Sequence, residues 1–425
     1  MKLAVIGGGS TYTPELVDGF ARLQAELPAD ELVLMDPSEQ RLERVGGLAS
    51  RIFAKQGHPG RVTTTTSVEE AVEGADAVLL QLRVGGQAAR QRDETWPLEC
   101  GCVGQETTGA GGLAKALRTV PVVLDIAEQV AKRAPEAWIV DFTNPVGIVT
   151  RSLLQAGHRA VGLCNVAIGL ERWFASLLEV EPARIRLDHV GLNHLTWERG
   201  VRLVDADGTG ERDVLPELFE RFGTEIAGHM HLPEPLLRRL GTVPSYYLRY
   251  FYQHDAVVEE LRHEESRAAT VARMEAELLE MYADPALDTK PALLEKRGGA
   301  YYSEAAVALV RSLLLDGGDV QVVNVRNGST LPFLPEDAVV EVPARVDASG
   351  AHPLPVAPLE PIYAGLVAGV TAYEHLALDA ALHGGRDRVS NALLAHPLVG
   401  QWDTAERLTD LLLANNREHL PWATA

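Results

Sequence analysis

The fold of the chain is decided by residues 2–16, which read KLAVIGGGSTYTPEL. The apolar run at residues 3–6 predicts a buried strand that leads directly into Gly7, Gly8 and Gly9 and then into a helix. Glycines at such a turn let the backbone approach a pyrophosphate, whose charge the N-terminus of the helix stabilises. A glycine-rich turn can be only a tight turn, but this context predicts a dinucleotide site that also includes Ser10 and Thr11.

A second apolar run, residues 32–35, ends in Asp36. An acid at the end of the second strand is placed to hold the ribose hydroxyls of NAD and to repel the extra phosphate of NADP. The pattern departs from the usual fingerprint in two respects. Tyr12 stands where a third glycine is expected, and Asp36 lies further along than the usual ~20 residues. The prediction of NAD therefore depends on the strand context and not on the glycines alone.

Composition indicates a globular protein of a reducing compartment. The 425 residues are 46% hydrophobic, enough for two or three domains of about 150 residues each. No run approaches the ~20 apolar residues of a membrane span, and we expect no targeting leader before the first strand. Three cysteines make no disulfide framework. We expect a cytoplasmic location and no membrane partner.

The charge balance argues against a polyanionic partner. Lys and Arg number 39 and Asp and Glu 59, so the formal net charge is 39 − 59 = −20. A chain of this sign is repelled by nucleic acid and by anionic lipid, although one small phosphate pocket is compatible with it.

The order of predicted elements gives the fold class. In the first 165 residues, strands at 62–66, 77–82, 137–142 and 160–163 alternate with helices at 68–75, 116–133 and 146–156. Such alternation implies a parallel sheet with right-handed crossovers. The fold predicted is α/β, with an N-terminal doubly wound, Rossmann-like NAD-binding domain over residues 1–165.

A larger α+β domain is predicted over residues 166–425, for substrate, metal and oligomerisation. Residues 184–205 suggest antiparallel strands, and long helices are expected at 256–283, 303–316, 362–383 and 402–416. The proline-rich residues 352–361 read as a crossing loop. The site is expected in the cleft between the two domains.

Polar residues follow the ends of the predicted strands, where open α/β sheets bind their ligands. Arg83 and Arg90 follow one strand, Asn144 and Pro145 another, and Cys164 a third. Pro145 suits the first turn of a helix that Asn144 could cap, so a capping role alone is an alternative for Asn144.

Metal ligation does not follow from spacing. Cys164 could be a small buried hydrophobe, and His194, thirty residues further on, could be a structural hydrogen-bonding residue. Cys100 and Cys102 lack ligand spacing and are expected to be structural.

Several motifs together resemble glycoside hydrolase family 4, the NAD- and divalent-metal-dependent glycosidases, and most of all its 6-phospho-β-glucosidases. They run nearly from end to end of the chain: GGGSTYTP at 7–14, RVGG at 83–86, VGQETTG at 103–109, DFTNP at 141–145, GLCN at 162–165, GLNH at 191–194, PSYYLRY at 244–250 and RGGA at 297–300. This family is an exception to the rule that glycosidases use two carboxylates.

The resemblance implies a reaction that fits both halves of the chain. NAD⁺ removes hydride from C3 of the sugar, and the ketone acidifies the proton on C2 for removal by a base. A metal on the sugar oxygens stabilises the enediolate. The bond to the leaving group breaks by elimination, water adds, and the hydride returns. The products from a 6-phospho-β-glucoside are glucose 6-phosphate and an alcohol, with no net oxidation.

Residue roles are implied by the resemblance alone. Cys164 and His194 are the metal ligands, commonly of Mn²⁺, although a thiolate is a soft ligand for that ion. Tyr247 is the base at C2; a free tyrosine has a pKa near ~10, so a nearby cation is needed. Its alternative is a core aromatic residue in a run rich in tyrosine, with Tyr246 as the main rival.

Substrate contacts are implied in the same way. Arg90 and Asn144 hold sugar hydroxyls, and Arg297 is the candidate for the 6-phosphate, with a structural ion pair as its alternative. Asn165 indicates the β-specific branch, because α-specific relatives carry an aspartate there as acid. Glu106 borders the site without an assigned step.

The substrate expected is thus a small phosphorylated glycoside, and the resemblance suggests a homodimer or homotetramer. The alternative function is an NAD-dependent dehydrogenase of the lactate/malate type, which would need no metal and would release NADH. A non-catalytic sensor of NAD or sugar phosphate is a third possibility, which intact Cys164, His194 and Tyr247 argue against.

Overall fold

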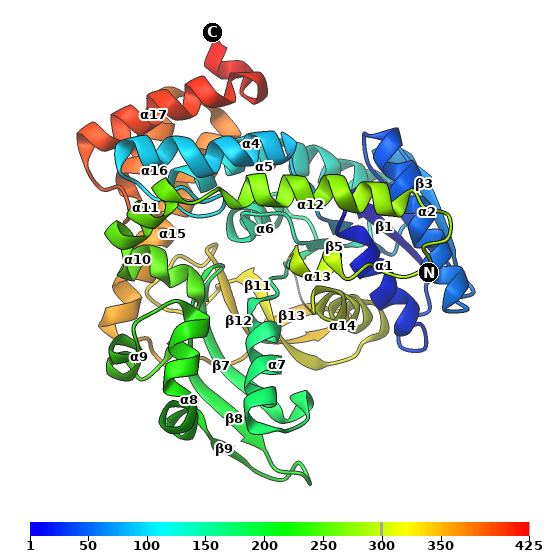
Figure 1. The fold of residues 1–425 in the computed structure, drawn as a ribbon, viewed down its shortest axis with the longest axis horizontal. Coiled ribbons are helices and arrows are strands. Elements are labelled where there is room, and N and C mark those ends of the chain that lie inside the picture. Colours follow the sequence, from blue (N-terminus) through cyan, green and yellow to red (C-terminus); the bar gives the residue numbers. More distant parts are fainter. Residues whose placement is uncertain (298–300, 425) are drawn as a thin grey trace.

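One sheet organises the computed structural model, which describes residues 1–297 and 301–424 (Figure 1). In this part of the chain thirteen strands pair in the order β10-β8-β7-β12-β11-β6-β5-β4-β1-β2-β3, with β13 beside β12 and β9 beside β8. The strands are β1 (Lys2–Ile6), β2 (Glu31–Met35), β3 (Arg61–Thr65), β4 (Ala77–Leu80), β5 (Trp138–Asp141), β6 (Ala160–Gly162), β7 (Ile185–Leu192), β8 (Leu195–Val204), β9 (Glu211–Asp213), β10 (Val243–Pro244), β11 (Asp319–Arg326), β12 (Val339–Asp347) and β13 (Gly350–Pro353).

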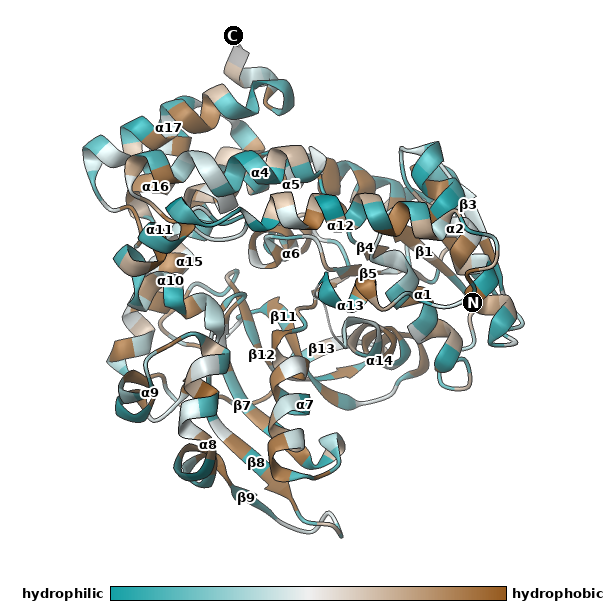
Figure 2. Cartoon of the chain, in the orientation of Figure 1, coloured by the Kyte–Doolittle hydropathy of each residue, from teal (hydrophilic) through white to brown (hydrophobic). Residues whose placement is uncertain are grey.

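The first six strands form the predicted parallel sheet. Their spatial order is 3-2-1-4-5-6, the order of a doubly wound dinucleotide-binding fold, so the predicted fold class is confirmed. β1, β2 and β4 are short apolar runs with almost no exposed residue. Such runs are typical of strands covered on both faces, and the strands are accordingly brown in Figure 2 while the surface helices carry teal.

The other strands continue this sheet in antiparallel fashion. β11 pairs with β6 through Asn324 and Gly162, and β12 joins β11 to β7. The predicted antiparallel segment at 184–205 is confirmed as the β7–β8 hairpin. Strands from both predicted domains thus share one sheet, and the division at residue 165 stays a prediction.

Helices cover the sheet, and α17 is the last of them along the chain. They are α1 (Thr13–Arg22), α2 (Glu39–Lys55), α3 (Val68–Val72), α4 (Gly86–Thr95), α5 (Gly109–Arg133), α6 (Val146–Gln155), α7 (Val166–Leu178), α8 (Leu215–Met230), α9 (Glu234–Leu240), α10 (Arg249–Tyr252), α11 (His254–His263), α12 (Arg267–Tyr282), α13 (Leu293–Lys296), α14 (Tyr302–Leu315), α15 (Pro361–His383), α16 (Arg386–Ala395) and α17 (Trp402–Asn416). α12 runs alongside α4 at the top of Figure 1. Within the described residues no helix is long and apolar enough to span a membrane.

Two local predictions were wrong. The single helix expected at 256–283 is two helices, α11 and α12. Ser266 stands at the end of the gap between them and caps α12, because its side chain accepts a hydrogen bond from the Ala269 amide at 3.2 Å. Asn144 is not a helix cap. α6 begins at Val146 with Pro145 in the cap position, and no side chain caps that end.

A buried ion pair joins α4, α5 and α17 above the sheet. The Arg118 guanidinium donates to Asp93 and, at 2.8 Å, to the Asn416 side chain, and the side chains of Arg118 and Asp93 are 1% and 0% exposed. Burial of both charges is tolerable only while each has its partner.

Replacement of Arg118 by methionine should lower the free energy of unfolding by about 3–5 kcal/mol, because Asp93 would remain buried without a cation. Urea denaturation measures the loss. Lys132→Met is the control: its ion pair with Glu128 is 64% and 65% exposed, so the same loss of charge should cost less than about 1 kcal/mol. Similar losses in the two variants would contradict this account of the pair.

Candidate active site

A large cavity lies at the carboxyl ends of the parallel strands. Its volume is about 2020 Å³, and the residues that line it come from both predicted domains. Of the residues singled out in the sequence, the cavity is lined by Gly7, Ser10, Asp36, Arg90, Asn144, Asn165, Tyr247 and Arg297. A cavity therefore lies where residues from both parts of the chain meet, while the assignment of the site residues stays a prediction.

The glycine turn forms one end of this cavity. Gly7 has φ +87°, and a Cβ there would lie 2.8 Å from the backbone oxygen of Gln81. The Gly7 and Gly8 amides both donate to the Met35 carbonyl, at 2.9 and 2.7 Å, which holds the turn against β2. Only glycine allows this close approach.

Asp36 closes the turn on its other side. One carboxylate oxygen accepts a hydrogen bond from the Gly9 amide at 3.1 Å, and the other accepts one from the Ser38 amide at 3.0 Å. Thr11 is fully buried behind the turn, where its carbonyl accepts a hydrogen bond from Tyr282. Asp36 also lines the cavity, and the sequence predicts that it holds a ribose there.

His194 occupies the tip of the β7–β8 hairpin in a left-handed conformation, φ +64°. This region is unfavourable for most side chains, and such strain gathers at functional sites. The Nδ1 atom of His194 lies 2.9 Å from the Thr107 hydroxyl.

The hydrogen bonds of Thr107 fix the tautomer of that ring. The Gln105 side-chain oxygen accepts from the Thr107 and Thr108 amides and from the Thr107 hydroxyl, which uses the single hydroxyl proton. The Thr107 oxygen must then accept from Nδ1–H of His194, so the lone pair lies on Nε2. Burial lowers the pKa of His194 to about 4, and the ring is neutral, as a metal ligand must be.

Cys164 follows β6 and is half-buried. Burial and the nearby Glu341 raise the pKa of its thiol, against hydrogen bonds to the sulfur from the Val166 and Asn165 backbones and from the Asn193 side chain. Asn193 is the neighbour of His194, so the structure brings the two predicted ligands to one place. No group of three His, Cys, Asp or Glu side chains with metal-ligand geometry occurs among the described residues.

That donor set fits a metal held by two protein ligands. A thiolate and an imidazole nitrogen are both good ligands of divalent transition metals, and an open catalytic site leaves positions for substrate and water. Cys164 and His194 do not themselves line the cavity but lie behind Tyr247, which does.

Tyr247 stacks directly on His194. The ring centroids are 3.6 Å apart and the planes differ by 8°. Tyr246, the rival in the sequence, packs on the outer face of this pair, 4.1 Å from Tyr247, and the two hydroxyls are hydrogen-bonded. Burial raises the pKa of Tyr247 well above its ordinary value, while Arg90 is the cation close enough to interact with it.

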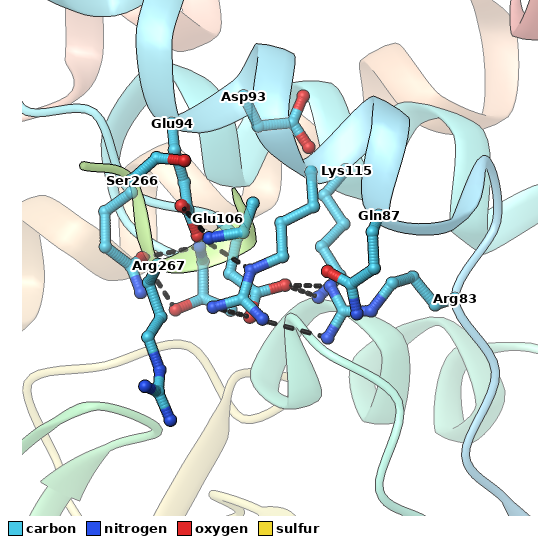
Figure 3. Close-up of polar contacts among 12 residues, drawn as sticks. Arg83, Gln87, Asp93, Glu94, Glu106, Lys115, Ser266 and Arg267 are labelled. Atoms are coloured by element: carbon cyan, nitrogen blue, oxygen red, sulfur yellow. Dashed lines mark hydrogen bonds and ion pairs between the residues drawn. The ribbon is translucent and has the colours of Figure 1, made fainter. Parts of the chain in front are cut away.

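Glu106 lies at the centre of a buried cluster of cations (Figure 3). It pairs with Arg83, with Arg90 at 3.2 Å and with Lys115 at 2.5 Å. Burial alone would raise its pKa, but Arg83, Lys115 and Arg90 hold it well below the usual value. Burial and Arg83 lower the pKa of Lys115, whose side chain is 3% exposed.

Lys115 was not identified from the sequence, although it lines the cavity. The signal was present: it is a lone charge in an apolar stretch of α5, LAKAL at 113–117. An unpaired lysine is almost never buried, so such a position predicts a buried anionic partner.

Asn144 and Arg297 both reach the cavity. Among the described residues the side-chain oxygen of Asn144 is buried without a hydrogen-bond partner, which leaves an acceptor for a ligand. Arg297 donates to Glu275 at 2.8 Å and lies 5.5 Å from the Tyr12 ring. The structural ion pair considered for Arg297 is therefore present. Gly298, Gly299 and Ala300 of the same motif lie outside the described residues.

The chain is similar in sequence to known proteins over nearly its whole length. Residues 2–180 match the family model "Family 4 glycosyl hydrolase" and residues 189–399 match its C-terminal domain. A probable 6-phospho-beta-glucosidase of Bacillus subtilis is 39% identical, over 99% of this chain and 97% of that protein. The 6-phospho-beta glucosidase structure of Thermotoga maritima with manganese, NAD⁺ and glucose-6-phosphate has a TM-score of 0.90 at 33% identity and covers 99% of both chains.

A structure of the α-specific type is more distant in sequence. The 6-phospho-alpha-glucosidase from gut microorganisms in complex with NAD and Mn²⁺ has a TM-score of 0.88 at 25% identity, with 99% of both chains covered. The two family models together match most of the chain. The chain belongs to glycosyl hydrolase family 4.

Proposed function

We propose that the chain hydrolyses 6-phospho-β-glucosides to glucose 6-phosphate and an alcohol, with NAD and a divalent metal, Mn²⁺ in first place, as cofactors. The observation that carries the proposal is the meeting of Cys164, His194 and Tyr247 beside a cavity that begins at a dinucleotide turn. The B. subtilis and T. maritima relatives carry names of this activity, which supports it.

The cofactors supply what the side chains lack. When bound, NAD offers a hydride acceptor to C3 of the sugar and the metal offers Lewis-acid polarisation of sugar oxygens. The residues that would hold NAD are Gly7, Gly8, Gly9, Ser10, Thr11 and Asp36, and Cys164 and His194 would hold the metal.

Tyr247 takes the proton from C2 in this proposal. Its stack on His194 fixes the ring next to the metal ligands, and its hydrogen bond to Tyr246 orients the hydroxyl. Arg90 lies close enough to favour the tyrosinate. Asn144 accepts a hydrogen bond from a sugar hydroxyl through its unpartnered oxygen, and Arg90 donates one to another.

Arg297 holds the 6-phosphate. Support comes from its position in the cavity wall and from its shared counter-ion. The carboxylate of Glu275 lies 2.8 Å from Arg297 and 3.8 Å from Arg41, so two guanidinium groups compete for one carboxylate. That local excess of positive charge suits a phosphate dianion, which arginine grips in two-point fashion.

The β linkage follows from Asn165, which begins α7 at the cavity. An amide cannot act as the acid that α-specific relatives place there.

We also propose a homodimer or homotetramer in the cytoplasm, for which the family resemblance and the three unpaired cysteines are the support.

Turnover should require NAD⁺ and Mn²⁺ without accumulation of NADH, because the hydride that leaves C3 returns to it. The assay is hydrolysis of p-nitrophenyl β-glucoside 6-phosphate, followed at the nitrophenolate and NADH absorbance bands together. Formation of NADH in proportion to product would favour the dehydrogenase alternative and contradict the proposal.

Tyr247→Phe should lower kcat by about 10²–10⁴-fold, the usual contribution of a general base. The phenyl ring preserves the stack on His194, so the Kd for Mn²⁺ should stay near the wild-type value. Tyr246→Phe is the matched control and should reduce kcat far less. Equal losses in the two variants would remove Tyr247 from the role of base.

The kcat/KM for p-nitrophenyl β-glucoside 6-phosphate should exceed that for the plain β-glucoside. Each charged hydrogen bond to the phosphate that the plain glucoside cannot make is worth about 1.5–3 kcal/mol, which corresponds to about 10–100-fold in kcat/KM. Arg297→Ala should erase most of that preference. Arg172→Ala is the control, since Arg172 also lines the cavity in an ion pair, with Glu304. An unchanged preference in Arg297→Ala would refute the phosphate assignment, and cleavage of the α-anomer alone would refute the linkage.

A further inference from the structure

The two proposed metal ligands come from strands that are not neighbours. Cys164 follows β6 and His194 lies in the turn after β7, while β11 and β12 lie between these strands in the sheet. On β11, Asn324 stands opposite Gly162, and on β12, Glu341 stands opposite Gly191. Gly162 lies two residues before Cys164 in the chain, and Gly191 lies three residues before His194.

Gly162 leaves room for a polar side chain on β11, whereas a Cβ at Gly191 would lie 2.0 Å from the backbone oxygen of Leu195 on β8. A Cβ at Gly162 would lie 2.9 Å from the Cβ of Asn324, closer than carbon atoms pack. Asn324 and Glu341 are 0% and 1% exposed, so both side chains lie inside the sheet junction beneath the ligands.

Glu341 accepts hydrogen bonds from the segment that carries His194 and from β11. Its Oε2 accepts hydrogen bonds from the side-chain amide of Asn193 at 2.9 Å and from the side-chain amide of Asn324 at 2.8 Å. The Asn193 side-chain amide also lies close enough to the Cys164 sulfur to lower the pKa of that thiol. Glu341 therefore fixes the amide that points at the thiolate.

The same carboxylate belongs to a buried charged triad. The His189 ring lies between Glu198, 2.6 Å from Nδ1, and Glu341, 3.0 Å from Nε2. Each ring nitrogen faces a carboxylate oxygen, so both must carry protons and the ring is an imidazolium. Burial alone would lower its pKa, but Glu198 and Glu341 raise it to about 10.

The triad carries a net charge of −1. In the described part of the structure the ion pairs of Glu198 and Glu341 both go to His189, and all three side chains are at most 2% exposed. A buried charge without a counter-ion costs several kcal/mol, so this arrangement calls for positive charge nearby.

We propose that Glu341 is a positioning residue of the metal centre, which holds Asn193 on the Cys164 thiolate and supplies the second negative charge that balances a divalent cation. The inference rests on the metal site proposed above. A thiolate and the triad contribute −1 each, which matches a dication, and outer carboxylates of this kind commonly orient and strengthen metal ligands.

The test is metal affinity in two variants of Glu341. E341Q keeps the shape and the acceptor oxygen but loses the charge, whereas E341D keeps the charge and shortens the reach. We expect the Kd for Mn²⁺ to rise about 10–100-fold in E341Q and less in E341D, with the Kd for NAD unchanged. A role confined to shape and packing predicts the reverse order.

Titration with Co²⁺ gives a readout that does not depend on activity. The wild type should show a thiolate-to-cobalt charge-transfer band that is absent in Cys164→Ser, and E341Q should need more Co²⁺ to develop it. Asp18→Asn is the control for loss of a buried carboxylate outside the site, because its partner Arg22 is 41% exposed, and it should bind Co²⁺ as the wild type does. If E341Q does not fold, Glu198→Gln removes the same net charge and should weaken binding in the same direction.

The outcomes separate the two proposals. Absence of the band in the wild type would overturn the metal site itself. A wild-type band with unchanged affinity in E341Q, or weaker binding in E341D than in E341Q, would overturn only the role of Glu341.

Discussion

The chemistry of this chain depends on the continuity of one sheet through a change of strand direction. A doubly wound sheet alone would place Cys164 beside a dinucleotide at the carboxyl edge of β6. The antiparallel strands that extend it bring the β7–β8 turn, with His194, to the same edge, and Tyr247 packs on that turn from a later segment. The proposed metal ligands and the glycine turn thus share one edge of the sheet, which neither half of the sheet would provide by itself.

Two buried groups of charged side chains lie near the place where Cys164, His194 and Tyr247 meet, and their net charges have opposite signs. On one side Arg83, Arg90 and Lys115 surround Glu106; on the other Glu198 and Glu341 enclose His189. Buried charge of this kind adds little to stability by itself, since desolvation offsets much of the attraction. Its value lies in the field it creates at a reacting centre, where fixed charges need no reorganisation during the reaction. The pKa of His194 is influenced by both groups.

The parallel half of the fold was predictable because its signals are local. β1, β2, β4 and β5 are unbroken apolar runs, and helices separate them, so strand type and direction follow from the sequence. The predicted strand at 137–142 differs from β5 by one residue at each end. β11 and β12 were not identified, because their pairing with β6 and β7 joins segments more than 140 residues apart. The break before α12 left a local signal in Ser266 that the helical pattern concealed.

The residues of the candidate site were also predictable only where their signals are local. Residues at strand ends, such as Asn144 and Cys164, follow from the positions of strands. Partners supplied by distant segments do not: nothing near Asn193 in the sequence indicates Glu341, 148 residues away. Family resemblance selected Tyr247 over Tyr246, and the stack on His194 supplies a physical reason for that choice which the aromatic run itself did not contain.

The central claim is that bond cleavage proceeds through removal of the proton on C2 of the sugar. Hydrolysis in D₂O tests it most directly, with the product glucose 6-phosphate analysed by NMR for deuterium at C2. The account predicts incorporation of solvent deuterium at that carbon, because the base exchanges its proton with water before it returns one. Full retention of the original hydrogen at C2, in product formed by the NAD- and metal-loaded protein, would contradict it.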